Sequence, residues 1–232
     1  MNTACTVASA VVSNTALALV ARAGPAPARK IVPLLVAISL VIFAGRATAL
    51  AAGPEDSVHS FYEALLGTMK QGRTLGESGR YARIEPVIRR LFDIPSMARL
   101  AVGGSWATLS PAQQQQVTTA FASYIAATYA DRFDSYSGQQ LEVTGQQPSG
   151  SGIMVRTRIV KASGEPVSID YLMRQNDGVW QISDVYLDSA ISQLATQRSE
   201  FGAILRREGF DGLITTLSRK VNLLTGTVAK AS

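Results

Sequence analysis

Apolar side chains recur every three or four residues after residue 54, which is the spacing of helices that bury one face. This pattern predicts a first helix from Glu55 to Lys70, with a buried face of Val58, Phe61, Tyr62, Leu65, Leu66 and Met69. After a turn region over residues 71–79, a second helix is expected to bury Ile84, Val87, Ile88 and Leu91. Pro86 lies inside it and should kink it or mark its start, because proline lacks an amide proton. A short helix is expected over Pro95–Val102.

The clearest helix start in the chain is Ser110-Pro111-Ala112-Gln113. It combines an N-cap hydroxyl, a proline at the first helical position and a glutamine three residues after the cap. The helix that begins here is predicted to be long. Its buried stripe is expected to consist of Val117, Ala120, Phe121, Tyr124, Ile125, Tyr129, Phe133 and Tyr136.

From Gln140 the apolar period changes to two, which indicates strands. Leu141 and Val143 begin the first strand, and two alternating stretches follow over residues 153–159 and 167–174. Asn176-Asp177-Gly178 predicts a tight hairpin turn into a strand over Val179–Leu187. The short connections favour an antiparallel meander. Because the last strand carries apolar residues on both parities, a bulge or bend is expected near Ser183.

Two amphipathic helices are expected to close the chain. The first would bury Ile191, Leu194, Phe201 and Leu205, and the second Phe210, Leu213, Ile214, Leu217 and Leu224. The sequence therefore predicts a single α+β domain, in which a four-stranded or slightly larger antiparallel sheet packs against several amphipathic helices.

The N-terminal residues have the order of a secretory signal peptide. Arg29 and Lys30 precede an uncharged run over residues 31–45, and Ala47-Thr48-Ala49-Leu50-Ala51 follows. The run is shorter than the roughly 20 apolar residues that span a bilayer, which makes an uncleaved anchor the weaker alternative. We expect a signal peptide with its preceding leader over residues 1–51, a mature domain over residues 52–232, and export to a bacterial periplasm.

Most of the formal net charge of +5 comes from this leader. Four of the 22 basic residues precede Glu55, the first acidic residue, so that 18 basic residues face 17 acidic ones in the rest of the chain. That balance argues against a nucleic-acid-binding surface. His59 and Cys5 are the only residues of their kinds, which excludes His-rich metal sites, disulfides and zinc–thiolate sites. We expect neither a metal nor a cofactor.

Candidate catalytic residues are few. A Ser- or Cys-based triad would need His59 as its base. Asp170, Asp184 and Asp188 come from predicted strands or a strand end, and one of them could act as a general base with Tyr171 or Tyr186 in a cone-shaped pocket. The alternative is that these carboxylates pair across the strands with Arg156, Arg158 or Arg174, which the similar numbers of strand Arg and Asp residues favour.

The apolar helix faces and the sheet allow two interiors. They could close a solid core, which would suit a structural adaptor, or bulky residues could hold the layers apart and leave a cleft for an apolar ligand. The apolar period is the same in both cases, so the pattern leaves both open.

Three stretches of the chain resemble one known family. They are Phe92-Asp93-Ile94 with residues 97–103, Trp106 and Leu109-Ser110-Pro111; residues 121–129 with Tyr136-Ser137-Gly138; and residues 180–187 with Ser192, Arg198, Glu200 and Phe201. From Asp56 to Leu224 the chain resembles the MlaC family, also called the toluene-tolerance or Ttg2 family. Asp188-Ser189-Ala190-Ile191-Ser192 stands where the family usually has Gly before Val and Ser, and with Arg198-Ser199-Glu200-Phe201 it resembles the hopanoid-associated HpnM branch.

The resemblance implies a non-enzymatic periplasmic lipid carrier with a fold similar in outline to NTF2. It would shuttle a phospholipid or a hopanoid between the inner and outer membranes as the soluble component of an ABC-type transport system. Its partners would be an inner-membrane ABC transporter complex and an outer-membrane lipoprotein complex. Lipid tails would enter a cavity between the sheet and the helices, with an expected lining of Val102, Trp106, Phe121, Ile125, Tyr129, Val155, Ile169, Tyr171, Val185, Leu187, Ile191 and Leu194. Ser192 and Arg198 are the candidates for contacting a polar headgroup.

Overall fold

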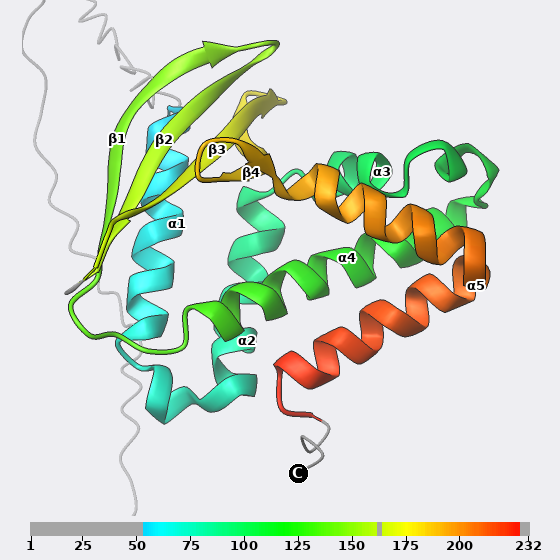
Figure 1. The fold of residues 1–232 in the computed structure, drawn as a ribbon, viewed down its shortest axis with the longest axis horizontal. Coiled ribbons are helices and arrows are strands. Elements are labelled where there is room, and N and C mark those ends of the chain that lie inside the picture. The colour runs from blue at the N-terminus through cyan, green and yellow to red at the C-terminus, as the bar shows by residue number, and fades with distance from the viewer. Residues whose placement is uncertain (1–52, 162–163, 228–232) are drawn as a thin grey trace, which may run out of the picture. The chain divides into compact units, whose positions relative to one another are not determined.

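Helices pack against one face of an antiparallel sheet (Figure 1). The structure is a computed structural model that describes residues 53–161 and 164–227, all within one compact unit. The expected leader therefore lies outside the described residues. The helices are α1 (Pro54–Met69), α2 (Gly72–Leu91), α3 (Ile94–Val102), the 3-10 helix η1 (Gly103–Thr108), α4 (Pro111–Arg132) and α5 (Gln193–Leu224). The strands are β1 (Gln140–Ser149), β2 (Gly152–Val160), β3 (Val167–Asn176), β4 (Val179–Leu187) and β5 (Ile191–Ser192).

The sheet is the predicted meander, extended by one short strand. Its order is β1-β2-β3-β4-β5, and each neighbouring pair is antiparallel. The turn between β3 and β4 is the predicted one: Asp177 and Gly178 both have positive φ, of 49° and 82°. Two positive-φ central residues match the right-handed twist of the flanking strands. The α+β fold class predicted from the sequence is confirmed.

A bulge in β4 lies where the sequence predicts it. Ile182 pairs with Met173 and Asp184 pairs with Leu172, so Ser183 is the extra residue between them. The Ser183 hydroxyl donates to the Leu172 carbonyl at 3.0 Å. The extra residue reverses the alternation, and Ile182 and Val185 are both buried as a result.

The second helix differs from its prediction. Residues 72–91 are helical apart from Gly76, whose φ of 64° and ψ of −175° break the helix, so the expected turn region over residues 71–79 was wrong. Pro86 neither starts this helix nor interrupts its backbone angles. Ala82, whose carbonyl would otherwise accept from residue 86, is exposed as Pro86 is, so water can satisfy that carbonyl.

The predicted start of α4 is confirmed, but its end is earlier than expected. The Ser110 hydroxyl accepts from the Gln113 amide and the Gln113 side chain accepts from the Ser110 amide, which completes the capping box. The helix ends at Arg132. Tyr136 therefore lies in the following loop, 43% exposed, and is no part of a buried stripe.

The two predicted closing helices are the two arms of α5. Gly209 separates them with a φ of 69°, and Figure 1 shows the second arm, in red, folded back beneath the first. An ion pair between Lys220 and Glu200 ties the arms together. Ile191 was expected in the first arm but belongs to β5, because the helix starts only after its N-cap, Ser192.

Aromatic side chains join the helices to the sheet. The Phe61 ring meets the rings of Tyr129, Phe92 and Tyr171 edge to face, with centroids 5.0, 5.2 and 6.0 Å apart. This cluster connects α1, the α2–α3 junction, α4 and β3 through one packed centre. Within the described residues, no helix combines the length and the apolar character that a bilayer-spanning segment requires.

Replacing Gly72 by Ala is expected to destabilise the fold. A Cβ atom at Gly72 would overlap the main-chain carbonyl of Asp134, a backbone atom that cannot rotate away. We expect the free energy of unfolding to fall by about 2 kcal/mol, measured by urea denaturation. Gly104 is the matched control, because a Cβ there meets nothing within 4 Å. Equal losses in the two variants would contradict the tight contact at Gly72.

Candidate functional site

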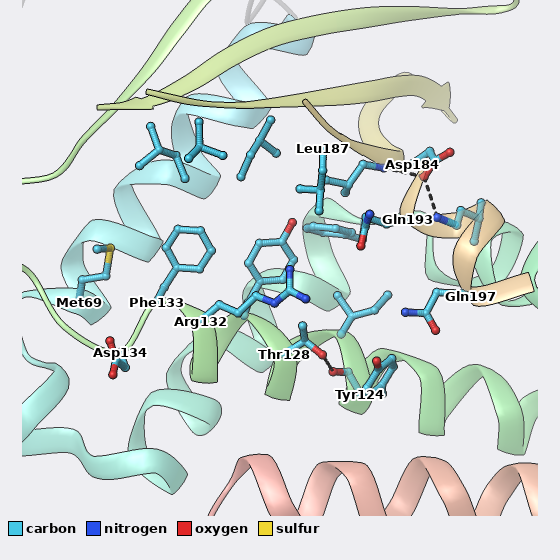
Figure 2. Close-up of a pocket in the computed structure, with 18 of the residues that line it drawn as sticks. Met69, Tyr124, Thr128, Arg132, Phe133, Asp134, Asp184, Leu187, Gln193 and Gln197 are labelled. Atoms are coloured by element: carbon cyan, nitrogen blue, oxygen red, sulfur yellow. Dashed lines mark hydrogen bonds between the residues drawn. The ribbon is translucent and has the colours of Figure 1, made fainter. Parts of the chain in front are cut away.

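A largely apolar cavity of about 470 Å³ lies between α4, the sheet and the start of α5 (Figure 2). Its apolar and aromatic lining consists of Met69, Phe92, Met97, Phe121, Ile125, Tyr129, Phe133, Ile159, Val167, Ile169, Val185, Leu187 and Leu194. Its more polar lining consists of Tyr124, Thr128, Arg132, Asp134, Ser135, Gln139, Lys161, Asp184, Gln193 and Gln197. A volume in this range is typical of pockets for small organic ligands.

Helix α4, together with its C-cap residue Phe133, contributes two adjacent rows of side chains to this cavity. One row consists of Phe121, Ile125, Tyr129 and Phe133, and the other of Tyr124, Thr128 and Arg132. Members of a row are four residues apart, so they stack along one face of the helix. The Thr128 hydroxyl donates to the Tyr124 carbonyl at 2.8 Å, which satisfies it within its own helix. The first row offers a ligand mainly hydrocarbon surface.

The opposite wall comes from the inner face of the sheet. Ile159 pairs with Val167 across β2 and β3, and Ile169 pairs with Leu187 across β3 and β4. Val185 adds to this wall because the bulge at Ser183 turns it inward. The sheet therefore supplies branched aliphatic side chains opposite the aromatic side chains of α4.

Asp184 is the buried acidic residue of the lining, and it stabilises the junction between β4 and α5. Its carboxylate accepts hydrogen bonds from the Ser192 hydroxyl at 2.6 Å, the Val185 amide at 2.7 Å and the Leu194 amide at 3.1 Å. Two of these donors belong to the turn into α5, whose first amide groups need acceptors. The carboxylate is thus engaged in fixing the chain at one end of the cavity (Figure 2).

Three tyrosines form a neutral polar cluster beside the cavity. Burial raises the pKa values of the Tyr62 and Tyr129 phenols, and burial with the neighbouring Tyr129 and Tyr62 raises that of Tyr171 further. The Tyr62 hydroxyl bonds to Thr157, and the Tyr171 hydroxyl is buried with no hydrogen-bond partner among the described residues. All three phenols stay protonated at neutral pH, so this side of the cavity carries no negative charge.

The structure places seven of the twelve expected lining residues on this cavity: Phe121, Ile125, Tyr129, Ile169, Val185, Leu187 and Leu194. The other five lie elsewhere. Val102, Val155 and Tyr171 are in the packed core, Trp106 packs against that core, and Ile191 is 54% exposed on β5. Sequence period does not distinguish these positions, because a core residue and a cavity residue can share one helix or sheet face.

The two expected headgroup residues do not line the cavity. The Ser192 hydroxyl caps α5 by accepting from the Ala195 amide at 2.9 Å and donates to Asp184. Arg198 lies against Gly103, with its Nε 3.2 Å from the position a Cβ would take there. Both side chains contact the protein's own backbone or side chains at these positions.

Several polar residues of the lining were not predicted from the sequence, among them Arg132, Lys161, Gln193 and Gln197. Arg132 could have been found from the sequence, because it lies three residues after Tyr129 on the same helical face. Lys161 and Gln193 lie at element ends, where the apolar period gives no signal.

The alternative of a catalytic carboxylate finds little support in the geometry. The Asp184 carboxylate already accepts three hydrogen bonds, and Asp170, which accepts from the Thr157 amide at 3.3 Å, does not line the cavity. The expected pairing of these carboxylates with strand arginines was also wrong: Arg158 pairs with Glu142 instead, at 2.6 Å. Among the described residues no group of three or more His, Cys, Asp or Glu side chains could hold a metal ion.

Comparison with known proteins agrees with this architecture. A family model described as MlaC protein matches residues 59–219. The chain belongs to the MlaC family. A solved phospholipid-binding protein from Ralstonia solanacearum, in complex with a phospholipid, has a similar fold with a TM-score of 0.63. The two chains are 22% identical, and the match covers 75% of this chain and 99% of the Ralstonia chain. The MlaC membership predicted from the sequence is confirmed.

Replacing Asp184 by Ala is expected to destabilise the protein by about 3 kcal/mol, because two amide groups and a hydroxyl lose a charged acceptor. Thermal or urea unfolding would measure the loss. Asp211, exposed on α5, is the matched control, and its replacement by Ala should change stability by less than about 0.5 kcal/mol. Equal stability of the two variants would contradict the role assigned to Asp184.

Proposed function

We propose that this MlaC-family protein is a lipid carrier of the bacterial periplasm. It takes the acyl chains of a phospholipid, or the ring system of a hopanoid, into the cavity between α4 and the sheet. As the soluble component of an ABC-type lipid transport system, it carries that lipid between the inner and outer membranes. The observation that carries the proposal is the cavity itself, with hydrocarbon side chains on both of its main walls.

The energetics of transfer fit such a carrier. Burying one methylene is worth about 0.8 kcal/mol, so an acyl chain of about 15 methylenes gains roughly 12 kcal/mol over exposure to water. A bilayer offers a similar gain, so cavity and membrane nearly balance. A docking partner can then tip the balance in either direction. We expect these partners to be an inner-membrane ABC transporter complex and an outer-membrane lipoprotein complex.

Two lipid classes fit this proposal. The phospholipid bound to the Ralstonia protein favours a phospholipid, since that chain shares the fold. The run Asp188-Ser189-Ala190-Ile191-Ser192 favours a hopanoid, because it resembles the HpnM branch. Organic extraction of freshly purified, undenatured protein, followed by mass spectrometry, would identify the lipid. Protein that carries no lipid and takes none up from labelled vesicles would contradict the carrier proposal.

An Asp substitution in the cavity wall is expected to impair lipid uptake. Ile125→Asp puts a charge among hydrocarbon side chains, where an acyl chain would have to lie against it, and should lower uptake at least tenfold. The measurement is transfer of a fluorescent phospholipid from vesicles to the full chain. The same substitution at Ile191, exposed on β5, is the matched control and should preserve uptake.

Circular dichroism and thermal unfolding would check that both variants are folded. Normal uptake by a folded Ile125→Asp variant would show that the lipid binds elsewhere. Tyr171 is unsuitable for this test, because it is fully buried in the core and a charge there would unfold the protein.

A further inference from the structure

Arg132 is a cationic side chain in a cavity whose walls are mostly hydrocarbon. Arg132 is the last residue of α4 and lies in one row with Tyr124 and Thr128. Figure 2 shows its side chain running back along the helix, and the residue is exposed to solvent where it lines the cavity. Helical side chains lean toward the N-terminus of their helix, which accounts for this direction. The cavity lining therefore includes a solvent-exposed positive charge as well as apolar surface.

No acidic side chain among the described residues forms an ion pair with Arg132; the described ion pairs involve Arg89, Arg158, Arg207 and Lys220. Asp134 lines the same cavity and lies two residues after Arg132 in the sequence. In Figure 2 the Asp134 carboxylate lies apart from the Arg132 guanidinium, and it accepts from the Ser135 hydroxyl at 2.9 Å. The guanidinium thus keeps its donors for a ligand.

The cavity lining supplies further hydrogen-bond donors, and its buried carboxylate, Asp184, already accepts three hydrogen bonds. Tyr129 is a neutral phenol, and the nearby guanidinium partly offsets the rise that burial causes in its pKa. Lys161, the residue after β2, adds a second cation to the lining, and Gln139 adds an amide. Arginine is suited to such a place because its planar fork binds a phosphate through two parallel hydrogen bonds.

We infer that Arg132 binds the phosphate of a phospholipid whose acyl chains occupy the cavity, and so selects lipids that carry a phosphate. This inference rests on the proposed lipid-carrier function. Arg132 takes the place of Ser192 and Arg198 as the expected headgroup contact, because those two side chains contact other parts of the protein. Phe121 and Arg132 are eleven residues apart on α4, so an acyl chain lying along the helix between them spans about 16 Å.

The test is a comparison of two lipids that differ in the phosphate. Phosphatidylcholine vesicles carry either fluorescent phosphatidylglycerol or fluorescent diacylglycerol with the same acyl chains, and transfer to the full-length protein is followed. Arg132→Gln is expected to lower phosphatidylglycerol transfer about tenfold, the loss typical of a charge-assisted hydrogen bond. Diacylglycerol transfer should be unchanged. Arg198→Gln is the matched control and should leave both transfers at the wild-type level.

Each other outcome contradicts a definite part of the inference. Unchanged phosphatidylglycerol transfer by Arg132→Gln would exclude Arg132 as the phosphate contact. Equal losses for the two lipids would show that Arg132 shapes the cavity without recognising phosphate. Wild-type protein that transfers neither lipid would overturn the carrier function itself, and with it this inference.

A further arm separates a lipid phosphate from a free one. Excess glycerol 3-phosphate should leave phosphatidylglycerol transfer unchanged, because the acyl chains supply most of the binding energy. Strong competition by glycerol 3-phosphate would instead indicate a site for soluble phosphates and would overturn the assignment to a lipid. Thermal unfolding of Arg132→Gln checks that the variant is folded.

Discussion

The interior of this protein depends on the aromatic contact that holds α4 at a fixed distance from the sheet. On one side Tyr129 packs against Phe61 of α1 and Phe92 at the α2–α3 junction, with ring centroids 5.0 and 5.8 Å apart. Phe61 in turn meets Tyr171 of β3 at 6.0 Å, which links α4 to the sheet. On its other side the same residue lines the cavity. Rings of this size are stiff and close-packed, so the helix cannot move onto the sheet without displacing the core. The packed core and the open cavity are therefore consequences of one arrangement.

The turn from β4 into α5 fixes the other end of the cavity. The bulge at Ser183 directs Val185 inward, and the Asp184 carboxylate then binds the Ser192 hydroxyl and the Leu194 amide at the start of α5. Bulges often re-aim side chains near functional sites, and a buried carboxylate that accepts several donors fixes a turn well. In an enzyme such a carboxylate could be a base. Here its three hydrogen bonds give it a structural role, which is to hold the turn between β4 and α5.

The local elements were predictable because their signals are local. The capping box at Ser110, the turn at Asp177-Gly178 and the bulge near Ser183 depend on residues within a few positions of each other. The predictions that were wrong involve tertiary context. Pro86 stays within α2 because solvent can satisfy the carbonyl it leaves free, and Ile191 joins the sheet because β4 pairs with it.

The sequence by itself determined the fold class, the helix and strand order and the MlaC membership. The reason is that periodicity, caps, turns and motifs depend on residues close together in the sequence. Only the tertiary structure decided which apolar residues face a cavity and which fill the core. Phe121 and Val102 are both apolar and almost fully buried, yet only Phe121 lines the cavity. The tertiary structure also decided that Arg132, and neither Ser192 nor Arg198, lines it. The physical reason is that the space between layers depends on side chains from distant segments, which the spacing within one segment does not encode.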